Sequence, residues 1–244
     1  MTDKPGYGSQ HSDPDWGCDY FEVETTESIG KIKVCHVIVK DIKTISEALA
    51  NKVLDTSWMT NLDVGSKRAY NRTVQETASA LVEIFKSTTA PSDVGSEFGE
   101  IMVSIGSTKA LETIFGHVIL PIAELWKPQL KQNEGFDFHT VCPNAFINFG
   151  EAKYSGSENP HGNAIKQSKG FIDNEKHLRD YVHLRELASK SAIENLNNDS
   201  FGIVASFSIN TEDPLQVLKN AIDSAQEKLN LDSIKSVYLI GVSQ

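Results

Sequence analysis

Two carboxylates and a lysine lie close together in the middle of the chain. Asp137 precedes the run Glu151, Ala152 and Lys153. Carboxylates held near one another repel each other unless a cation neutralises them, so this grouping beside a lysine predicts a divalent metal site with a positioned ammonium. Hard oxygen ligands of this kind suit Mg²⁺ or Mn²⁺.

A β-hairpin is expected to position these side chains. Residues 136–141 and 146–154 are rich in aromatic and β-branched residues, and the sequence Cys-Pro-Asn-Ala between them is typical of a turn. Asp137 lies at the start of the first predicted strand. Glu151 and Lys153 are two residues apart on the second strand, so their side chains should project from one face.

The pattern of Asp137 followed by Glu151-Ala152-Lys153 resembles the signature of the PD-(D/E)xK nuclease superfamily, although Phe136 occupies the position of its proline. The resemblance implies an α+β protein with a restriction-endonuclease-like core, in which helices flank a central mixed β-sheet. It also implies metal-dependent hydrolysis of DNA phosphodiester bonds. Asp137, Glu151 and the carbonyl of Ala152 would hold Mg²⁺ or Mn²⁺, and Lys153 would orient the attacking water and stabilise charge on the phosphate.

The same resemblance implies a further carboxylate on the helix before the sheet. Glu100 is the candidate, because it lies in the sequence Glu97-Phe98-Gly99-Glu100 at the start of a predicted helix over residues 96–114. Helical periodicity instead places Glu100 nearly opposite the apolar stripe of that helix, whereas Glu97 flanks the stripe. The choice between the two acids stays open, as does the alternative that both only favour the helix dipole.

Two more residues are candidates for contact with the substrate. Gln167 lies on a predicted helix over residues 163–173, where related nucleases carry a glutamine that approaches the scissile phosphate. His139 shares the face of Asp137 by strand alternation and could contact the phosphate. A structural role for His139 is the alternative.

The chain is predicted to divide near residue 90. The stretch Ser-Thr-Thr-Ala-Pro-Ser at residues 87–92 is typical of a boundary between an N-terminal α/β section (residues 1–90) and a nuclease-like domain (residues 91–244). The N-terminal section should contain a strand and two helices. The second part should continue as helix, strand, hairpin, helices, strand, helix and strand. Hydrophobic periodicity places these elements at residues 31–40, 44–55, 69–85, 96–114, 116–121, 163–173, 174–195, 201–209, 214–229 and 234–242.

The first 28 residues are polar and acidic, with a few aromatic residues among them. They are expected to form either a partly disordered arm or a segment that docks on a partner through Trp16, Tyr20 and Phe21. The N-terminal section is therefore the candidate for partner docking.

The overall charge is unusual for a protein that binds DNA alone. The formal net charge is −10, whereas phosphate neutralisation by basic residues supplies most non-specific DNA affinity. Either basic residues cluster locally, as at Lys166, Lys169, Lys176 and Arg179, or a partner delivers the nucleic acid. The chain lacks an apolar run long enough for a membrane span or signal peptide, and its three cysteines have no metal-binding spacing, so a cytoplasmic location is expected.

Three short segments carry a narrower resemblance. Residues 97–100, 135–139 and 149–154 look like the nuclease subunits of the Hachiman anti-phage defence systems, in which a small nuclease works with a helicase. That resemblance implies a helicase or ATPase subunit as partner, which would account for the acidic charge. The alternative is a non-catalytic assembly or regulatory subunit that retains a nuclease fold.

Overall fold

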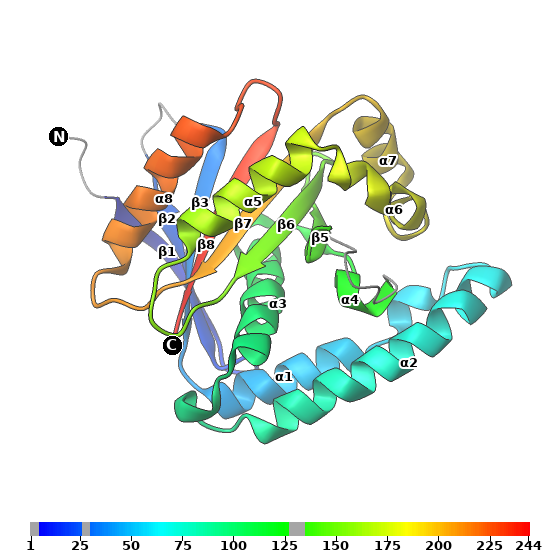
Figure 1. The fold of residues 1–244 in the computed structure, drawn as a ribbon, viewed down its shortest axis with the longest axis horizontal. Coiled ribbons are helices and arrows are strands. Elements are labelled where there is room, and N and C mark those ends of the chain that lie inside the picture. The colour runs from blue at the N-terminus through cyan, green and yellow to red at the C-terminus, as the bar shows by residue number, and fades with distance from the viewer. Residues whose placement is uncertain (1–4, 26–29, 127–134) are drawn as a thin grey trace.

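A single eight-stranded sheet connects the two halves of the chain in a computed structural model that describes residues 5–25, 30–126 and 135–244 (Figure 1). The strand order is β1-β2-β3-β8-β7-β6-β5-β4. The strands are β1 (Gly6–Asp13), β2 (Cys18–Glu24), β3 (Ile32–Val39), β4 (Val118–Ile119), β5 (Phe138–Val141), β6 (Ile147–Lys153), β7 (Phe201–Ser208) and β8 (Ser236–Ser243).

The sheet is mixed, with parallel pairing at its centre and antiparallel pairing on both flanks. Neighbours among β3, β8, β7 and β6 pair in parallel. The β1/β2, β2/β3, β4/β5 and β5/β6 pairs are antiparallel. The central strands are buried on both faces because helices cover them, which explains their continuous apolar sequence.

Helices form a layer on each face of the sheet. The α-helices are α1 (Ile42–Leu54), α2 (Val64–Ser87), α3 (Ser96–Phe115), α4 (Ala123–Trp126), α5 (His161–Asp173), α6 (Tyr181–Leu187), α7 (Lys190–Asn197) and α8 (Pro214–Lys228). Three 3₁₀ turns are η2 (Ser57–Met59), η3 (Pro91–Asp93) and η4 (Lys176–Asp180). This arrangement confirms the predicted α+β class with helices flanking a mixed sheet.

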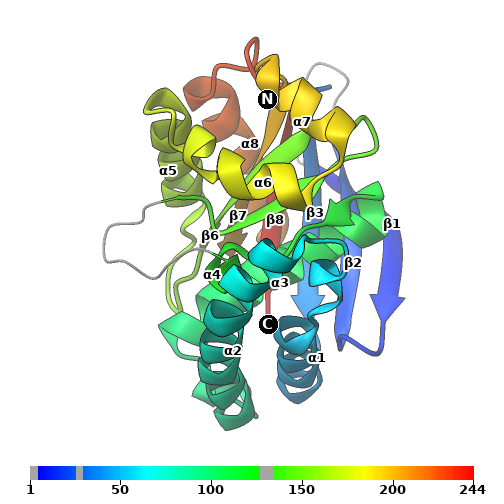
Figure 2. The ribbon, with the colours of Figure 1, turned by 90° about the vertical axis from the view of Figure 1, so that its right-hand side faces the viewer.

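Helix α3 lies against one face of the sheet and is buried along most of its length. It contacts strands β2 to β8 on its inner side. On its outer side it packs against α1, and Phe85 of α2 meets Phe98 with ring centroids 6.0 Å apart. Helices α5 and α8 cover the opposite face (Figures 1 and 2).

The sheet runs across the predicted boundary at residue 90. Strand β3, from the N-terminal section, pairs in parallel with β8 at the C-terminal end of the chain. Side chains from both sections also share one apolar cluster, as Leu49 of α1 and Val204 of β7 illustrate. The N-terminal section therefore contributes strands to the same sheet and residues to the same core as the rest of the protein.

The N-terminal segment is not the arm that its polar sequence predicts. Residues 6–24 form the hairpin β1/β2, which extends the sheet beyond β3. Tyr20 is 0% exposed and belongs to the core, so its proposed role as a partner contact is wrong. Trp16 packs partly buried against the same core, and Phe21 is partly buried on β2. The prediction failed because the acidic residues of this segment alternate with core residues along β2.

Two helix boundaries differ from the sequence prediction for local reasons. Helix α2 begins at Val64 rather than at residue 69, because the carboxylate of Asp63 accepts hydrogen bonds from the backbone N–H groups of Gly65 and Ser66 at 2.7 and 3.1 Å. The predicted helix over residues 174–195 is instead divided into η4, α6 and α7. Glu175 has a left-handed φ of 54°, and Ser189 caps a new helix.

Within the described ranges, no helix combines the length and the apolar character that a membrane crossing requires.

Candidate active site

The β5/β6 hairpin places Asp137 beside the end of β6. The backbone N–H of Asp137 donates to the carbonyl of Gly150 at 2.9 Å. The carboxylate of Asp137 accepts a hydrogen bond from the backbone N–H of Ala152 at 2.7 Å. The N–H and C=O groups of one strand residue point to the same edge, so the Ala152 carbonyl also faces the side on which Asp137 lies.

Glu151 and Lys153 project from one face of β6 and form an ion pair. Their register partners on β7 are Ala205 and Phe207, whose side chains pack in the cluster beneath α5 and α8. The Lys153 Nζ lies 2.7 Å from Glu151 Oε1, and the lysine side chain is 24% exposed. Glu151 is 0% exposed, so the carboxylate is shielded from solvent while the lysine paired with it is partly exposed.

Glu151 carries the strongest electrostatic perturbation of the site. Burial, and then the charge of Asp137, raise the pKa of Glu151 from 4.5 to about 8, although Lys153 opposes the shift. Burial acts to lower the pKa of Lys153, but the charges of Glu151, Asp137 and Glu100 outweigh it, so that pKa is raised. The site therefore favours a positive charge and penalises the second negative charge.

The oxygens of Glu151 retain unused capacity to accept bonds. The Lys153 ammonium is the polar partner of Oε1, at 2.7 Å. Among the described residues, Oε2 has no hydrogen-bond donor. A buried carboxylate oxygen without a donor is costly unless a cation satisfies it.

This donor set fits a hard divalent cation. It comprises the carboxylates of Asp137 and Glu151 and the carbonyl of Ala152. In the described part of the chain no group of three or more His, Cys, Asp or Glu side chains is arranged to hold a metal. Mg²⁺ commonly binds through only one or two carboxylates and completes its shell with water and substrate oxygens, so two carboxylates and a carbonyl suffice.

Glu100 approaches the site from the first turns of α3. Glu100 and Glu97 are both exposed on that helix. The charge of Glu100 raises the pKa of both Glu151 and Lys153, which places it within electrostatic range of the pair. Glu100 lies away from the apolar stripe of α3, but the end of β6 lies beside the first turns of that helix.

Gly99 allows α3 to come this close to β6. A Cβ built at Gly99 would lie 2.3 Å from ring atoms of Tyr154, the residue that follows Lys153. The helix backbone therefore rests directly on the tyrosine ring. This contact fixes the separation between the Glu100 helix and the Glu151 strand.

We expect Gly99→Ala to destabilise the protein by about 1 to 3 kcal/mol, because the new methyl group overlaps the Tyr154 ring. Denaturant unfolding followed by circular dichroism measures the change. Gly106→Ala is the matched control, since Gly106 also lies inside α3 and a Cβ at that position meets no atom within 4 Å. Equal stability of the Gly99 and Gly106 variants would contradict the proposed contact.

Phe136, which stands at the proline position of the pattern, is a core residue. It is buried and packs against Phe149 and Phe171, with ring centroids 5.2 and 5.3 Å away. These contacts join the start of β5 to β6 and α5. Phe136, in place of proline, thus supports the position of Asp137 by packing in the core.

His139 lies in the core rather than on an exposed surface. Its Nε2 is 3.0 Å from Asp180 Oδ2, and the ring is 0% exposed. Trp126 and Phe149 pack against it. This position supports the structural alternative for His139 and does not support contact with a phosphate.

Gln167 is half-buried on α5, beside the buried residues Ala164 and Ser168. Helix α5 packs on β6 and β7 and covers the face that carries Glu151 and Lys153. Gln167 therefore lies on the same side of the sheet as Glu151 and Lys153.

Ser208 and Asn210 support the loop after Lys153, and no sequence pattern predicted this role. The Asn210 side-chain amide donates to the carbonyls of Ser155 and Glu158 at 2.6 and 2.7 Å. Ser208 Oγ donates to the Ser155 carbonyl at 3.0 Å, and the Ser155 backbone N–H donates to Ser208 Oγ at 2.9 Å. The end of β7 therefore holds the loop that leaves the site.

Comparison with known proteins gives no relative: no family model, curated protein or solved structure matches the chain.

Proposed function

We propose that this protein is a metal-dependent nuclease with a restriction-endonuclease-like core that hydrolyses DNA phosphodiester bonds. The observation that carries the proposal is the convergence of Asp137, Glu151 and Lys153. The Asp137 carboxylate binds the backbone beside Glu151, and the Lys153 ammonium lies 2.7 Å from Glu151 Oε1. Glu151 Oε2 is buried and has no donor among the described residues, which supports a cation as its partner.

Mg²⁺ or Mn²⁺ would be held by Asp137, Glu151 and the carbonyl of Ala152. When bound, such an ion lowers the pKa of a water molecule and neutralises charge on the phosphate. The raised pKa of Glu151, caused first by burial and then by Asp137, supports this assignment because a divalent cation would favour the ionised carboxylate.

Lys153 supplies the mobile positive charge of the proposed reaction. Its flexible stem and three donors suit it to orienting the attacking water and stabilising charge that develops on the phosphate. Its partial exposure leaves the ammonium accessible to a substrate, whereas Glu151 is shielded. Glu100 adds negative charge near the pair and is proposed to orient water or assist in holding the cation.

DNA delivery by a partner is part of the proposal. The formal net charge of −10 opposes binding to a polyanion by this chain alone. The cations on and after α5 are partly engaged: Lys169 pairs with Asp173, and the Lys176 ammonium lies 4.6 Å from the Phe171 ring centroid. We therefore propose a helicase or ATPase subunit as partner in an anti-phage defence complex.

A cleavage assay on the purified chain and on its complex with the product of the neighbouring reading frame tests this function. We expect cleavage of DNA with Mg²⁺ and none with excess chelator. RNA substrates and reactions with and without ATP define the substrate and the dependence on a partner. Metal-dependent assembly without cleavage under any condition would instead favour the non-catalytic assembly subunit.

A further inference from the structure

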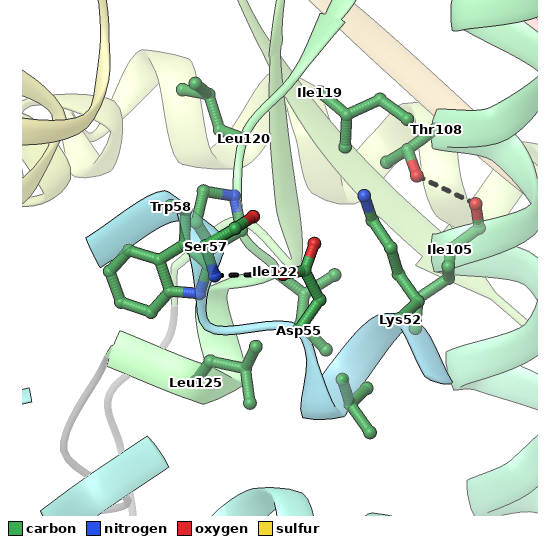
Figure 3. A pocket seen from close by; sticks show the side chains of 12 residues that line it. Lys52, Asp55, Ser57, Trp58, Ile105, Thr108, Ile119, Leu120, Ile122 and Leu125 are labelled. Atoms are coloured by element: carbon green, nitrogen blue, oxygen red, sulfur yellow. Dashed lines mark hydrogen bonds between the residues drawn. The ribbon is translucent and has the colours of Figure 1, made fainter. Parts of the chain in front are cut away.

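A small pocket lies beside α3 near the β4 edge of the sheet, between the end of α1, the turn η2 and the segment from β4 to α4 (Figure 3). Its volume is about 140 Å³. Apolar side chains form most of the wall. They are Val53, Ile105, Ile119, Leu120, Ile122 and Leu125.

Two hydrogen-bond donors line the same pocket. Lys52 extends its ammonium into the space between Ile119 and Thr108, as Figure 3 shows. The indole Nε1 of Trp58 is buried and has no acceptor among the described residues. A buried donor without a partner costs free energy, so the Trp58 indole favours a ligand that brings an acceptor atom. The half-buried Lys52 adds a positive charge beside it.

The side-chain acceptors that line the pocket are already engaged. Asp55 is exposed, and its carboxylate accepts from the backbone N–H of Ser57 at 2.9 Å. Hydrogen bonds from Ser57, and less strongly the charge of Lys52, lower the pKa of Asp55. The hydroxyl of buried Thr108 donates to the carbonyl of Ile105 at 2.8 Å. A cationic ligand would therefore compete with Lys52 for the exposed Asp55 carboxylate.

The size of the pocket limits the ligand. An apolar cavity of roughly 150 Å³ accommodates a benzene ring, whereas drug-sized ligands need roughly 300 Å³ or more. This pocket can hold one aromatic or branched aliphatic group with a small polar end. A nucleotide or a long acyl chain is too large.

We propose that this pocket binds a small organic carboxylate with a compact apolar group. The apolar group packs between α3 and the β4–α4 segment, and the carboxylate accepts hydrogen bonds from Lys52 and Trp58. The ligand shares the Lys52 ammonium with Asp55 and satisfies the orphaned indole donor. This inference concerns binding alone and does not depend on the proposed DNA hydrolysis.

The pocket wall is connected directly to the strand of the candidate active site. The backbone N–H of Ala123, next to Ile122 in the wall, donates to the carbonyl of Asp137 at 3.0 Å. The N–H of Leu120 donates to the carbonyl of His139 at 3.1 Å. A ligand that orders this wall also orders the backbone on which Asp137 is carried.

Titration with benzoate tests the proposal through the tryptophan indole signals in a ¹H–¹⁵N spectrum. The chain has three tryptophans, and the signal of Trp58 is identified by its loss in Trp58→Phe. We expect a saturable shift of that signal with a Kd on the order of 1 mM, as befits a fragment-sized ligand. Benzylamine, which has the same ring and the opposite charge, should not shift it.

Lys52→Met should weaken benzoate binding about tenfold or more, because it removes a charge-assisted hydrogen bond. Lys43→Met is the matched control, since Lys43 is exposed on the same helix and should leave affinity unchanged. The absence of a saturable Trp58 shift, or benzylamine binding as tight as that of benzoate, would overturn the proposal. Undiminished benzoate affinity in a folded Lys52→Met variant would overturn it as well.

Discussion

Replacing Lys153 with methionine is expected to lower the rate of Mg²⁺-dependent DNA cleavage by about 10²- to 10³-fold. Methionine retains the length of the side chain but cannot stabilise charge on the phosphate or orient water, and the loss of one such preorganised group has an effect of this size. Glu151→Gln should reduce cleavage at least as much, because an amide is a poor ligand for a hard cation. Single-turnover cleavage by the purified complex measures both.

Controls for these variants are available on neighbouring helices. Lys169 pairs with Asp173 on α5, so Lys169→Met should cleave at the rate of the unaltered protein. The double variant Glu151→Ala with Lys153→Ala should lose little more than the worse single variant, because residues that act as a unit are not additive. If the double variant still cuts DNA while remaining folded, the catalytic site lies elsewhere.

Glu151→Gln should also stabilise the metal-free protein at alkaline pH. The folded-state pKa of Glu151 is raised from 4.5 to about 8 by burial and the charge of Asp137. Between these two values the folded state binds more protons than the unfolded state, so the free energy of unfolding falls as pH rises. Glutamine mimics the neutral form and removes this dependence. The gain at pH 8 to 9 is at most a few kcal/mol, at roughly 1.4 kcal/mol for each pKa unit.

Denaturant unfolding at several pH values between 6 and 9, in the presence of a chelator, measures this effect. Glu97→Gln is the control, since Glu97 is exposed on α3 and should retain the pH slope of the unaltered protein. Added Mg²⁺ should stabilise the unaltered protein by preferential binding to the folded state and should do little for Glu151→Gln. An identical pH slope in the unaltered protein and the Glu151 variant would contradict the assigned burial penalty.

Local sequence patterns predicted the elements around the candidate site well. The aromatic and β-branched residues flanking the turn at 142–145 indicated a hairpin, and the structure has β5 and β6 there. Alternation along β6 was enough to place Glu151 and Lys153 on one face, where they form an ion pair. These predictions succeeded because strand periodicity and turn chemistry are properties of a few adjacent residues.

Other predictions failed where distant segments decide the outcome. The polar segment before residue 25 becomes a hairpin because β3 offers it an edge and the core accepts Tyr20. For His139, the choice between the two roles left open by the sequence also depends on a distant segment, because Asp180 provides a buried partner for its ring. No local pattern identifies such partners.

The sequence by itself determined the types of side chain at the candidate site, the strand that carries Glu151 and Lys153, and the α+β class, whereas Asp137 lies just before β5 rather than inside the predicted strand. Only the tertiary structure decided the burial of Glu151, the contact of Gly99 with Tyr154, and the pocket that joins Lys52 to Trp58. The physical reason is the separation along the chain over which each effect acts. Periodicity acts over neighbouring residues, whereas burial and electrostatic shifts depend on atoms that meet only after the whole sheet and its helices have packed.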